Sequence, residues 1–175
     1  MATYQIDSSH SSVGFSIKHM MIAKVHGAFE KLTGILEYDP ANPKEAKLDV
    51  VIEAASINTR EPQRDTHLKS ADFFDVEKFP TLTFKSKKVE GSNGELKVTG
   101  DLTIHGVTKE VVLDVEGPTG ELKDPWGNIK IGASATTKIK RKDFGLSWNA
   151  ALEAGGILVG EDVAISLDVQ FAKKV

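Results

Sequence analysis

Two dense clusters of charged and aromatic residues are where this chain of 175 residues could carry out chemistry. The first cluster is RDTHLKSADFFDVEKFP, residues 64–80, in which Asp65 and His67 could form an acid/base pair. A pair of helix residues that satisfy their own hydrogen bonds at the surface is the commoner arrangement, and no further catalytic residues accompany this pair. We therefore expect Asp65 and His67 to be structural.

Other catalytic and metal-binding motifs are missing from the sequence. It contains no G-x-S-x-G nucleophile elbow, no phosphate-binding P-loop and no G-x-G-x-x-G motif. The absence of cysteine excludes a thiolate nucleophile, a disulfide framework and a Cys-based zinc site. The five histidines form no HxH or HxxxH pair, which would place two metal ligands on one face: His10, His19, His26, His67 and His105. We therefore expect neither an enzyme nor a bound metal or cofactor.

The second cluster is KRKDFGLSWN, residues 140–149, in which Arg141 and Asp143 could pair while Phe144 and Trp148 lie among alternating residues. One interpretation is a charged rim around an aromatic pocket mouth, where Arg141 would meet an anionic headgroup. The other is a tight corner after a strand, with a surface ion pair that contributes about 0–1 kcal/mol. The local chemistry supports both interpretations equally.

Strands must position these clusters, because apolar and polar residues alternate along most of the chain. The alternating runs are residues 13–19, 24–39, 48–54, 82–84, 96–104, 111–115, 129–139 and 163–171. Turn sequences such as GSNGE and HGVTK separate some of the runs, which makes the neighbouring strands antiparallel. The sequence therefore predicts an all-β fold of eight antiparallel strands. They could close into a barrel or stack as two sheets, and we favour the barrel.

Small residues at predicted inward positions bear on whether the barrel is hollow. They are Gly14, Ala54, Gly100, Ala133 and Ala135. An eight-stranded barrel that is lined partly by small side chains can hold one ligand. The alternative is that these residues only accommodate curvature, and that phenylalanine side chains fill the space.

A short helix is predicted over residues 59–71, between the third and fourth strands. Thr59 can cap its start, and Pro62 suits its first turn. Such a helix would lie across one barrel end with the following aromatic residues pointing inward: Phe73, Phe74 and Phe79. A hydrophobic plug and a ligand gate are equally compatible with this pattern.

The bulk properties exclude several classes of protein. The net charge of −3 is spread along the chain, which argues against a nucleic-acid partner. No apolar run approaches the ~18 residues that suggest a membrane span, so we expect no stable membrane insertion. The first residues do not resemble a secretory signal, so we expect a cytoplasmic protein, or a periplasmic one if the chain is a processed form. We expect residues 1–175 to form a single domain.

The two clusters, together with HSSVGFSIKHMMIAKVHGAF, SINT, GDLTIHGVTKEV and GGILVGEDVAISLDV, resemble the YceI-like family of bacterial polyisoprenoid-binding proteins. The similarity follows the same order along nearly the whole chain. It implies a lipocalin-like, eight-stranded antiparallel barrel that encloses a long apolar chain, such as a polyisoprenoid or an isoprenoid quinone tail. It also implies no catalysis and frequent homodimers.

By position, the resemblance implies two sets of site residues. The pocket wall would consist of Phe15, Ile17, His19, Met20, Phe73, Phe74, Phe79, Phe144 and Trp148. Polar motif positions that face the mouth, or that pin the helix to the barrel, would be Arg64, Asp65, His67, Arg141 and Asp143.

The sequence and the resemblance together predict a soluble lipid-binding protein. Removing an apolar chain from water would contribute roughly 25 cal/mol for each Å² buried. Transport, storage or sequestration of an isoprenoid lipid would follow. The alternatives are a barrel that binds another amphiphile, such as a fatty acid or fatty amide, an enzyme that acts on an isoprenoid lipid, and a structural barrel with a filled core.

Overall fold

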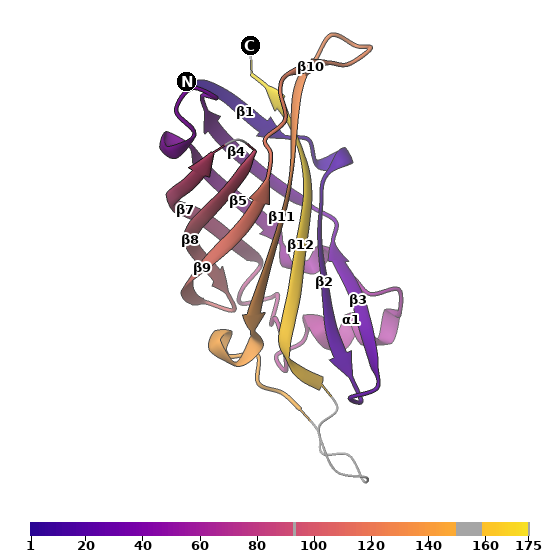
Figure 1. Ribbon diagram of the computed structural model, residues 1–175. Coiled ribbons are helices and arrows are strands. Elements are labelled where there is room, and N and C mark those ends of the chain that lie inside the picture. The colour runs from indigo at the N-terminus through magenta and orange to yellow at the C-terminus, as the bar shows by residue number, and fades with distance from the viewer. Residues whose placement is uncertain (93, 150–158, 175) are drawn as a thin grey trace.

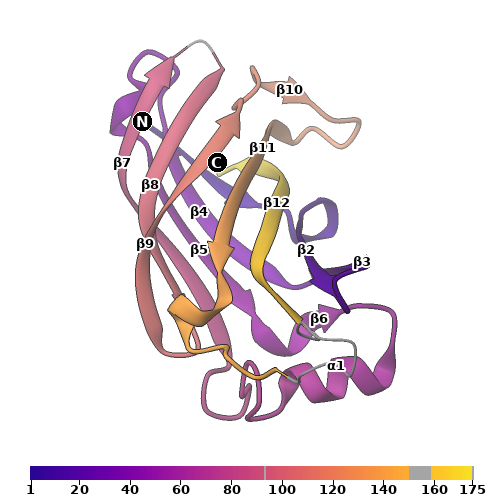
Figure 2. The ribbon, with the colours of Figure 1, turned by 60° about the horizontal axis from the view of Figure 1, so that its bottom comes forward.

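Strands dominate the computed structural model of the protein, which describes residues 1–92, 94–149 and 159–174. Eight of them form a closed ring in which all neighbours are antiparallel (Figure 1; Figure 2). In order, the ring consists of β11 (Ile129–Lys140), β9 (Val107–Glu116), β8 (Glu95–Ile104), β7 (Thr81–Ser92), β5 (Lys47–Glu53), β4 (Leu32–Tyr38), β1 (Ala2–Ile6) and β12 (Val159–Lys173), which pairs again with β11. The predicted eight-stranded antiparallel barrel is confirmed.

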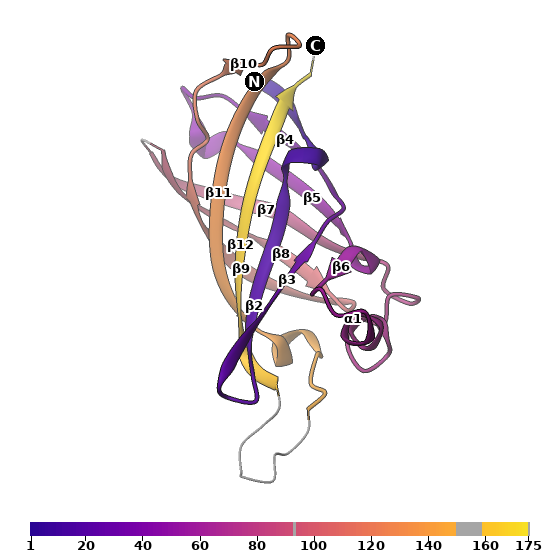
Figure 3. The same cartoon turned by 90° about the vertical axis from the view of Figure 1, so that its right-hand side faces the viewer.

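The sheet continues beyond the ring at one end of β12. Residues 171–173 of β12 pair with β1, whereas residues 159–168 pair with β2 (Ser12–His19). β2 pairs with β3 (Ala23–Phe29), and β3 pairs with the two-residue strand β6 (Ile57–Asn58). The β2–β3 pair therefore extends past the ring (Figure 3).

Alternation explains how β12 can join these neighbours with one continuous apolar face. Its residues Val163, Ile165 and Leu167 lie directly opposite Ile17, Phe15 and Val13 of β2. Ser166, between Ile165 and Leu167, and Asp168, after Leu167, are exposed. This part of β12 thus presents apolar residues to the interior and polar residues to solvent.

The strands of the structure differ from the prediction in three places. The sequence pattern missed β1, whose five residues bury only Tyr4 and Ile6 and are too few for alternation to stand out. A 3₁₀ turn, η1 (Ser8–His10), then separates β1 from β2. The predicted run over residues 24–39 divides into β3 and β4, and a second 3₁₀ turn, η3 (Ala54–Ser56), separates β5 from β6.

The predicted helix lies in the expected place, between β6 and β7, but it is shorter. It is α1 (Pro62–Lys69), and its N-cap is Glu61, whose carboxylate accepts a hydrogen bond from the Gln63 amide at 3.3 Å. The prediction that Thr59 caps the helix is wrong, because Thr59 is buried and bonds to side chains of α1 instead. The remaining short elements are η2 (Pro43–Glu45), β10 (Leu122–Lys123) and η4 (Arg141–Phe144). Within the described ranges, no helix has the length and apolarity needed to cross a membrane.

Candidate functional site

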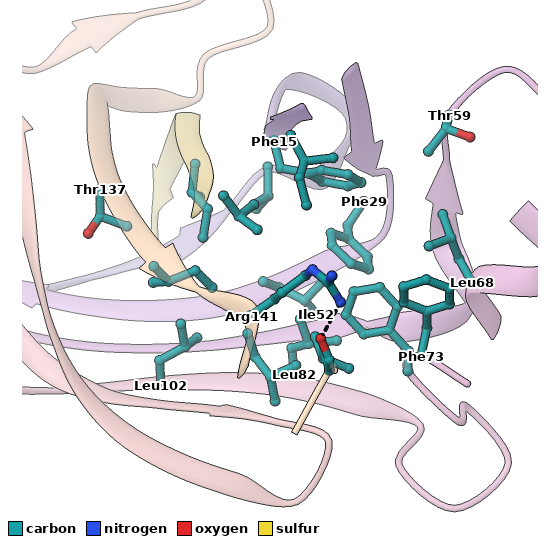
Figure 4. A pocket seen from close by; sticks show the side chains of 18 of the residues that line it. Phe15, Phe29, Ile52, Thr59, Leu68, Phe73, Leu82, Leu102, Thr137 and Arg141 are labelled. Atoms are coloured by element: carbon teal, nitrogen blue, oxygen red, sulfur yellow. Dashed lines mark hydrogen bonds between the residues drawn. The ribbon is translucent and has the colours of Figure 1, made fainter. Parts of the chain in front are cut away.

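An apolar cavity of about 270 Å³ lies inside the barrel (Figure 4). Its lining includes residues of α1, of η4 and of the end of β2, and these elements lie at one end of the barrel (Figure 1). Its wall is built from inward residues of β2, β3, β5, β7, β8, β9, β11 and β12, together with α1 and the segment that follows it. Aliphatic side chains such as Val50, Leu102, Leu113 and Leu167 form much of the wall. The barrel is therefore hollow at this end.

Polar side chains in the wall belong mostly to the elements at the barrel end. They are Lys18, His19, Thr59, Arg64, His67 and Arg141. Thr137 of β11 also borders the cavity, and its hydroxyl donates a hydrogen bond to the Val112 carbonyl at 2.9 Å. The cavity thus combines an apolar interior with a polar border at one end.

A second apolar space of about 80 Å³ lies farther along the barrel, toward the end at which both termini lie. It shares the wall residues Leu48, Val50, Leu113 and Leu167 with the first cavity. Ala133 and Ala135 line this second space, so these two small residues leave room in the interior. At Gly100, by contrast, the Phe84 ring fills the space, since a Cβ there would lie 2.8 Å from Phe84 Cε2.

Six of the nine predicted wall residues border the larger cavity: Phe15, Ile17, His19, Phe73, Phe74 and Trp148. The other three lie elsewhere. Met20 is in the exposed β2–β3 turn, and Phe79 packs against His105 with ring centroids 4.8 Å apart. Phe144 is buried in the core of the barrel. Contact of the six with a ligand stays a prediction.

One aromatic group in the wall joins β2 and β3 to the segment after α1. Phe29 contacts Phe15 and Phe74, with ring centroids 5.7 Å and 5.6 Å away. Phe15 can lie close to the backbone because residue 27 is glycine. A Cβ at Gly27 would come within 2.9 Å of Phe15 Cε1 and 2.8 Å of Thr59 Cγ2. The absence of a side chain at Gly27 therefore sets the position of one cavity wall.

A second aromatic group connects α1 with the segment after η4. His67 meets Trp148 edge-on at 4.7 Å between ring centroids, and it also meets Phe73 at 5.1 Å. Phe73 and Trp148 are 5.4 Å apart. Because these residues come from elements far apart in the sequence, the group holds two sides of the barrel end together.

Thr59 anchors α1 through two charged side chains. The Asp65 carboxylate accepts hydrogen bonds from the Thr59 amide at 2.9 Å and from its hydroxyl at 2.5 Å. Arg64 donates from Nε to the Thr59 hydroxyl at 2.8 Å and from a terminal nitrogen to the Thr59 carbonyl at 2.7 Å. Asp65 and Arg64 therefore pin the helix to the end of β6, while Arg64 also borders the cavity.

Asp65 and His67 do not form the acid/base pair that the sequence allowed. His67 Nε2 instead lies 2.8 Å from an oxygen of Asp72, and Asp65 bonds to Thr59. Residues two apart on a helix do not face each other, which explains the different partners.

Arg141 is almost completely buried, with 3% of its surface exposed, and its hydrogen-bond acceptors are mainly backbone carbonyls. It donates hydrogen bonds to Leu146 at 2.5 Å, Trp148 at 2.8 Å, Gly160 at 2.8 Å and Val159 at 3.2 Å. Figure 4 shows its guanidinium group among the apolar side chains of the wall. Arg141 therefore ties the Trp148 segment to the start of β12.

The charge of Arg141 is balanced by Glu161 at 3.5 Å, not by Asp143. Burial lowers the pKa of Arg141, and Glu161 opposes this shift. Asp143 is exposed on η4, so its predicted pairing with Arg141 is wrong. Asn149 strengthens the same connection, because its side-chain amide exchanges two hydrogen bonds with the Val159 backbone, at 2.8 Å and 3.0 Å. Within the described part of the chain, no group of three or more His, Asp or Glu side chains could hold a metal ion.

The family model of the YceI-like domain matches residues 4–171 of the chain. The chain belongs to the YceI-like family. It is 39% identical over 173 residues to the UPF0312 protein SA2479 of Staphylococcus aureus (strain N315), with 98% of each chain covered. A Campylobacter jejuni YCEI protein of known structure is 39% identical to this chain, with a TM-score of 0.72. The alignment covers 97% of this chain and 96% of that protein.

A more distant structural neighbour of this YceI-like protein is a polyisoprenoid binding domain from Saccharophagus degradans, implicated in plant cell wall breakdown. The TM-score is 0.71, and the alignment covers 99% of this chain and 100% of that domain. The two sequences are only 16% identical, so this likeness shows the fold.

Sequence reasoning about the YceI-like site missed much of the cavity wall. Val163 and Ile165 of β12 border the cavity, as do Thr59 and Lys18. Alternation could identify the inward face of each strand, but it could not show which part of that face borders empty space. Thr59 carried a misleading signal, because its type and its position before Pro62 also suit a helix cap.

Proposed function

We propose that this YceI-like protein binds a long apolar lipid chain of the polyisoprenoid or isoprenoid quinone type, for transport, storage or sequestration. The observation that carries the proposal is the apolar cavity of about 270 Å³, whose polar side chains lie mostly at one barrel end. Such a cavity can take an apolar chain out of water while a polar headgroup stays at the mouth.

The size and shape of the space favour a slender ligand. Pockets for drug-sized molecules typically measure about 300–1,000 Å³, so the larger cavity is near the lower limit. The second space of about 80 Å³ continues in the same direction along the barrel and shares wall residues with the first. A flexible chain that enters at the α1 end could extend toward this second space.

The headgroup would meet a restricted set of polar groups. Arg141 directs its donors to backbone carbonyls and to Glu161, so we propose that it shapes the wall and does not bind the headgroup. Lys18 and His19 border the cavity from the end of β2, and Arg64 and His67 border it from α1. These four side chains are the proposed headgroup contacts.

The relative from Saccharophagus degradans supports a polyisoprenoid as the ligand, since it shares the fold and is described as a polyisoprenoid binding domain. A fatty acid or fatty amide would use the same apolar cavity and is the second candidate. An enzymatic role has less support, because Asp65 and His67 have separate partners. A barrel with a filled core is not compatible with the cavity.

Solvent extraction of the purified protein, followed by mass spectrometry, tests the proposal. We expect one prenyl lipid for each protein molecule. A stoichiometric fatty acid or amide would support the second candidate instead. If the extract contains neither class and the protein binds neither prenyl nor acyl probes, the proposed function is wrong.

Two substitutions in one segment provide a matched comparison. Phe74 borders the cavity, whereas Phe79 packs on His105 outside it. We expect Phe74→Asp to weaken prenyl-lipid binding at least tenfold, which corresponds to about 1.4 kcal/mol, because it places a charge in the apolar wall. Phe79→Leu should change binding by less than about twofold, since the residue does not border the ligand. Equal lipid binding by Phe74→Asp and the wild type would refute the proposed position of the ligand.

A further inference from the structure

Three large apolar side chains are exposed at the turn between β2 and β3. Met20, Met21 and Ile22 have 44%, 60% and 84% of their surface exposed, and together we call them the apolar tip. Single exposed apolar residues are ordinary on protein surfaces, but three consecutive ones on a projecting turn form a patch. Packing of the barrel core does not explain why the apolar tip consists of three exposed apolar side chains.

The backbone of the apolar tip is unfavourable for the residues that it carries. Met20 and Met21 have φ values of 53° and 61°, and the Ile22 amide donates a hydrogen bond to the His19 carbonyl at 3.3 Å. A turn with positive φ at both central residues normally takes Asn-Gly, because larger side chains are strained there. The two methionines thus reduce stability while they remain exposed, which is typical of residues kept for function.

The hairpin beneath the tip carries only positive charges. Lys18 and Lys24 lie directly opposite each other on β2 and β3, and both are exposed. No carboxylate side chain occurs between Asp7 and Glu30 in the sequence, although the whole chain has a net charge of −3. Within the described residues, neither lysine forms an ion pair with a carboxylate. Among the residues that the structure describes, these two ammonium groups therefore flank the apolar tip without a carboxylate partner.

The apolar tip also lies next to the mouth of the cavity. His19 directly precedes it and borders the cavity, and α1 and η4 are at the same end of the barrel (Figure 1; Figure 3). A surface that contacts the tip would therefore be near the opening through which a ligand enters.

We propose that the apolar tip docks on the surface of a lipid bilayer that contains anionic lipids. Met20, Met21 and Ile22 enter the region between headgroups and acyl chains, and Lys18 and Lys24 contact the anionic headgroups. Docking in this way turns the cavity mouth toward the membrane. The purpose of docking, exchange of a lipid between bilayer and cavity, rests on the proposed function, but the docking contact itself does not.

Flotation with vesicles tests the contact directly. The vesicles consist of phosphatidylcholine with or without phosphatidylglycerol and contain no isoprenoid, so that the cavity ligand plays no part. We expect the wild-type protein to float with the anionic vesicles, and to bind at least tenfold more weakly to phosphatidylcholine alone or at high salt. The reason is that the lysines act through electrostatic attraction, which salt screens.

The double variant Met20→Asn/Met21→Gly separates docking from folding. We expect it to lose vesicle binding by at least tenfold while it resists urea as well as the wild type or better, since Asn-Gly suits the turn. Trp126→Ser is the matched control, because Trp126 is 82% exposed in the turn between β10 and β11. β10 lies at the end of the barrel opposite the β2–β3 turn (Figure 1). This control should float like the wild type.

Several outcomes would overturn the docking proposal. They are absence of wild-type flotation, equal flotation of the double variant, and loss of flotation in the Trp126 control. A wild-type dimer that the double variant converts into monomers, without vesicle binding, would assign the tip to contact between two copies. The proposed function can fail independently of docking. If the protein releases no lipid and binds no probe but still floats, the docking contact is supported and the proposed function is wrong.

Discussion

Arg141 lines the cavity wall, is buried, and directs its donors to the backbone. Its guanidinium group donates hydrogen bonds to four carbonyls: those of Leu146 and Trp148 in the segment after η4, and those of Val159 and Gly160 at the start of β12. Because Arg presents several donors in a fixed planar arrangement, one side chain can satisfy backbone groups that burial would otherwise leave unpaired. We therefore regard Arg141 as a residue that positions Trp148.

We predict that Arg141→Lys lowers the free energy of unfolding by at least about 2 kcal/mol, because a lysine cannot reach all four carbonyls and leaves buried acceptors unpaired. Urea denaturation measures this change. Lys142→Ala is the control, since Lys142 is exposed, and we expect it to change stability by less than about 0.5 kcal/mol. An Arg141→Lys variant as stable as the wild type would contradict the positioning role.

Residue types and the family resemblance together predicted part of this site. Phe73, Phe74 and Trp148 border the cavity as expected, because bulky apolar residues in a strand-rich chain turn inward. The role of Arg141 could not be predicted, since Glu161 is twenty positions away and the carbonyl partners carry no sequence signature. The same limit applies to Asp65, whose partner is decided by the path of the chain between β6 and α1.

Among the elements, the break between β1 and β2 determines how β2 reaches the cavity. Asp7 lies at this break, where its carboxylate accepts hydrogen bonds from Lys130 Nζ at 2.6 Å and from the Ser9 amide at 3.1 Å. The Lys130 ammonium group, with smaller contributions from Ser9 and His10, holds the pKa of Asp7 well below its usual range. Asp7 thus connects η1 to β11 while it carries a negative charge.

The lowered pKa predicts a pH dependence of stability. A carboxyl group whose pKa is lower in the folded state stabilises the fold above its unfolded pKa, near 3.9, and loses this contribution as the pH falls. We therefore expect Asp7→Asn to lower the urea midpoint at pH 7, and the difference from the wild type to shrink progressively below about pH 4.

Asp168→Asn provides the control for the Asp7 measurement, because Asp168 is an exposed aspartate of β12. It should have little effect on the urea midpoint at pH 7. If Asp7→Asn destabilises the protein equally at pH 7 and pH 3, or not at all, the ion pair with Lys130 does not stabilise the break as we argue.

Elements were predictable where they are long and regular. Alternation located the ring strands from β7 onward, because one face of each of these strands must be apolar, and the break in alternation located the helix. It did not show that the run at residues 24–39 is interrupted, or that the short strand β6 follows the run at residues 48–54, since both depend on which neighbour each segment pairs with. For the same reason the sequence could not show that β2 and β3 extend beyond the ring.

For the whole molecule, the asymmetry between the two barrel ends is the main result. The larger cavity, the polar border and the apolar tip occur at the α1 end, and the two termini lie at the other (Figure 1). Closure of the barrel was predictable from eight amphipathic strands. The small inward residues pointed to a hollow interior but left a filled one open, because the outcome depends on how large side chains such as Phe84 pack against Gly100.

The most direct test of the central claim, that the α1-end cavity binds an apolar chain, uses the two tryptophans of the protein. Trp126 is exposed in the turn between β10 and β11, away from the cavity, and Trp148 borders the cavity. Fluorescence of a Trp126→Phe variant therefore reports on the cavity alone. Titration with a prenyl alcohol should give a saturable change in Trp148 emission at one ligand per protein, and Phe74→Asp should abolish it. No saturable change, or an unaltered titration in the Phe74→Asp background, would contradict the account.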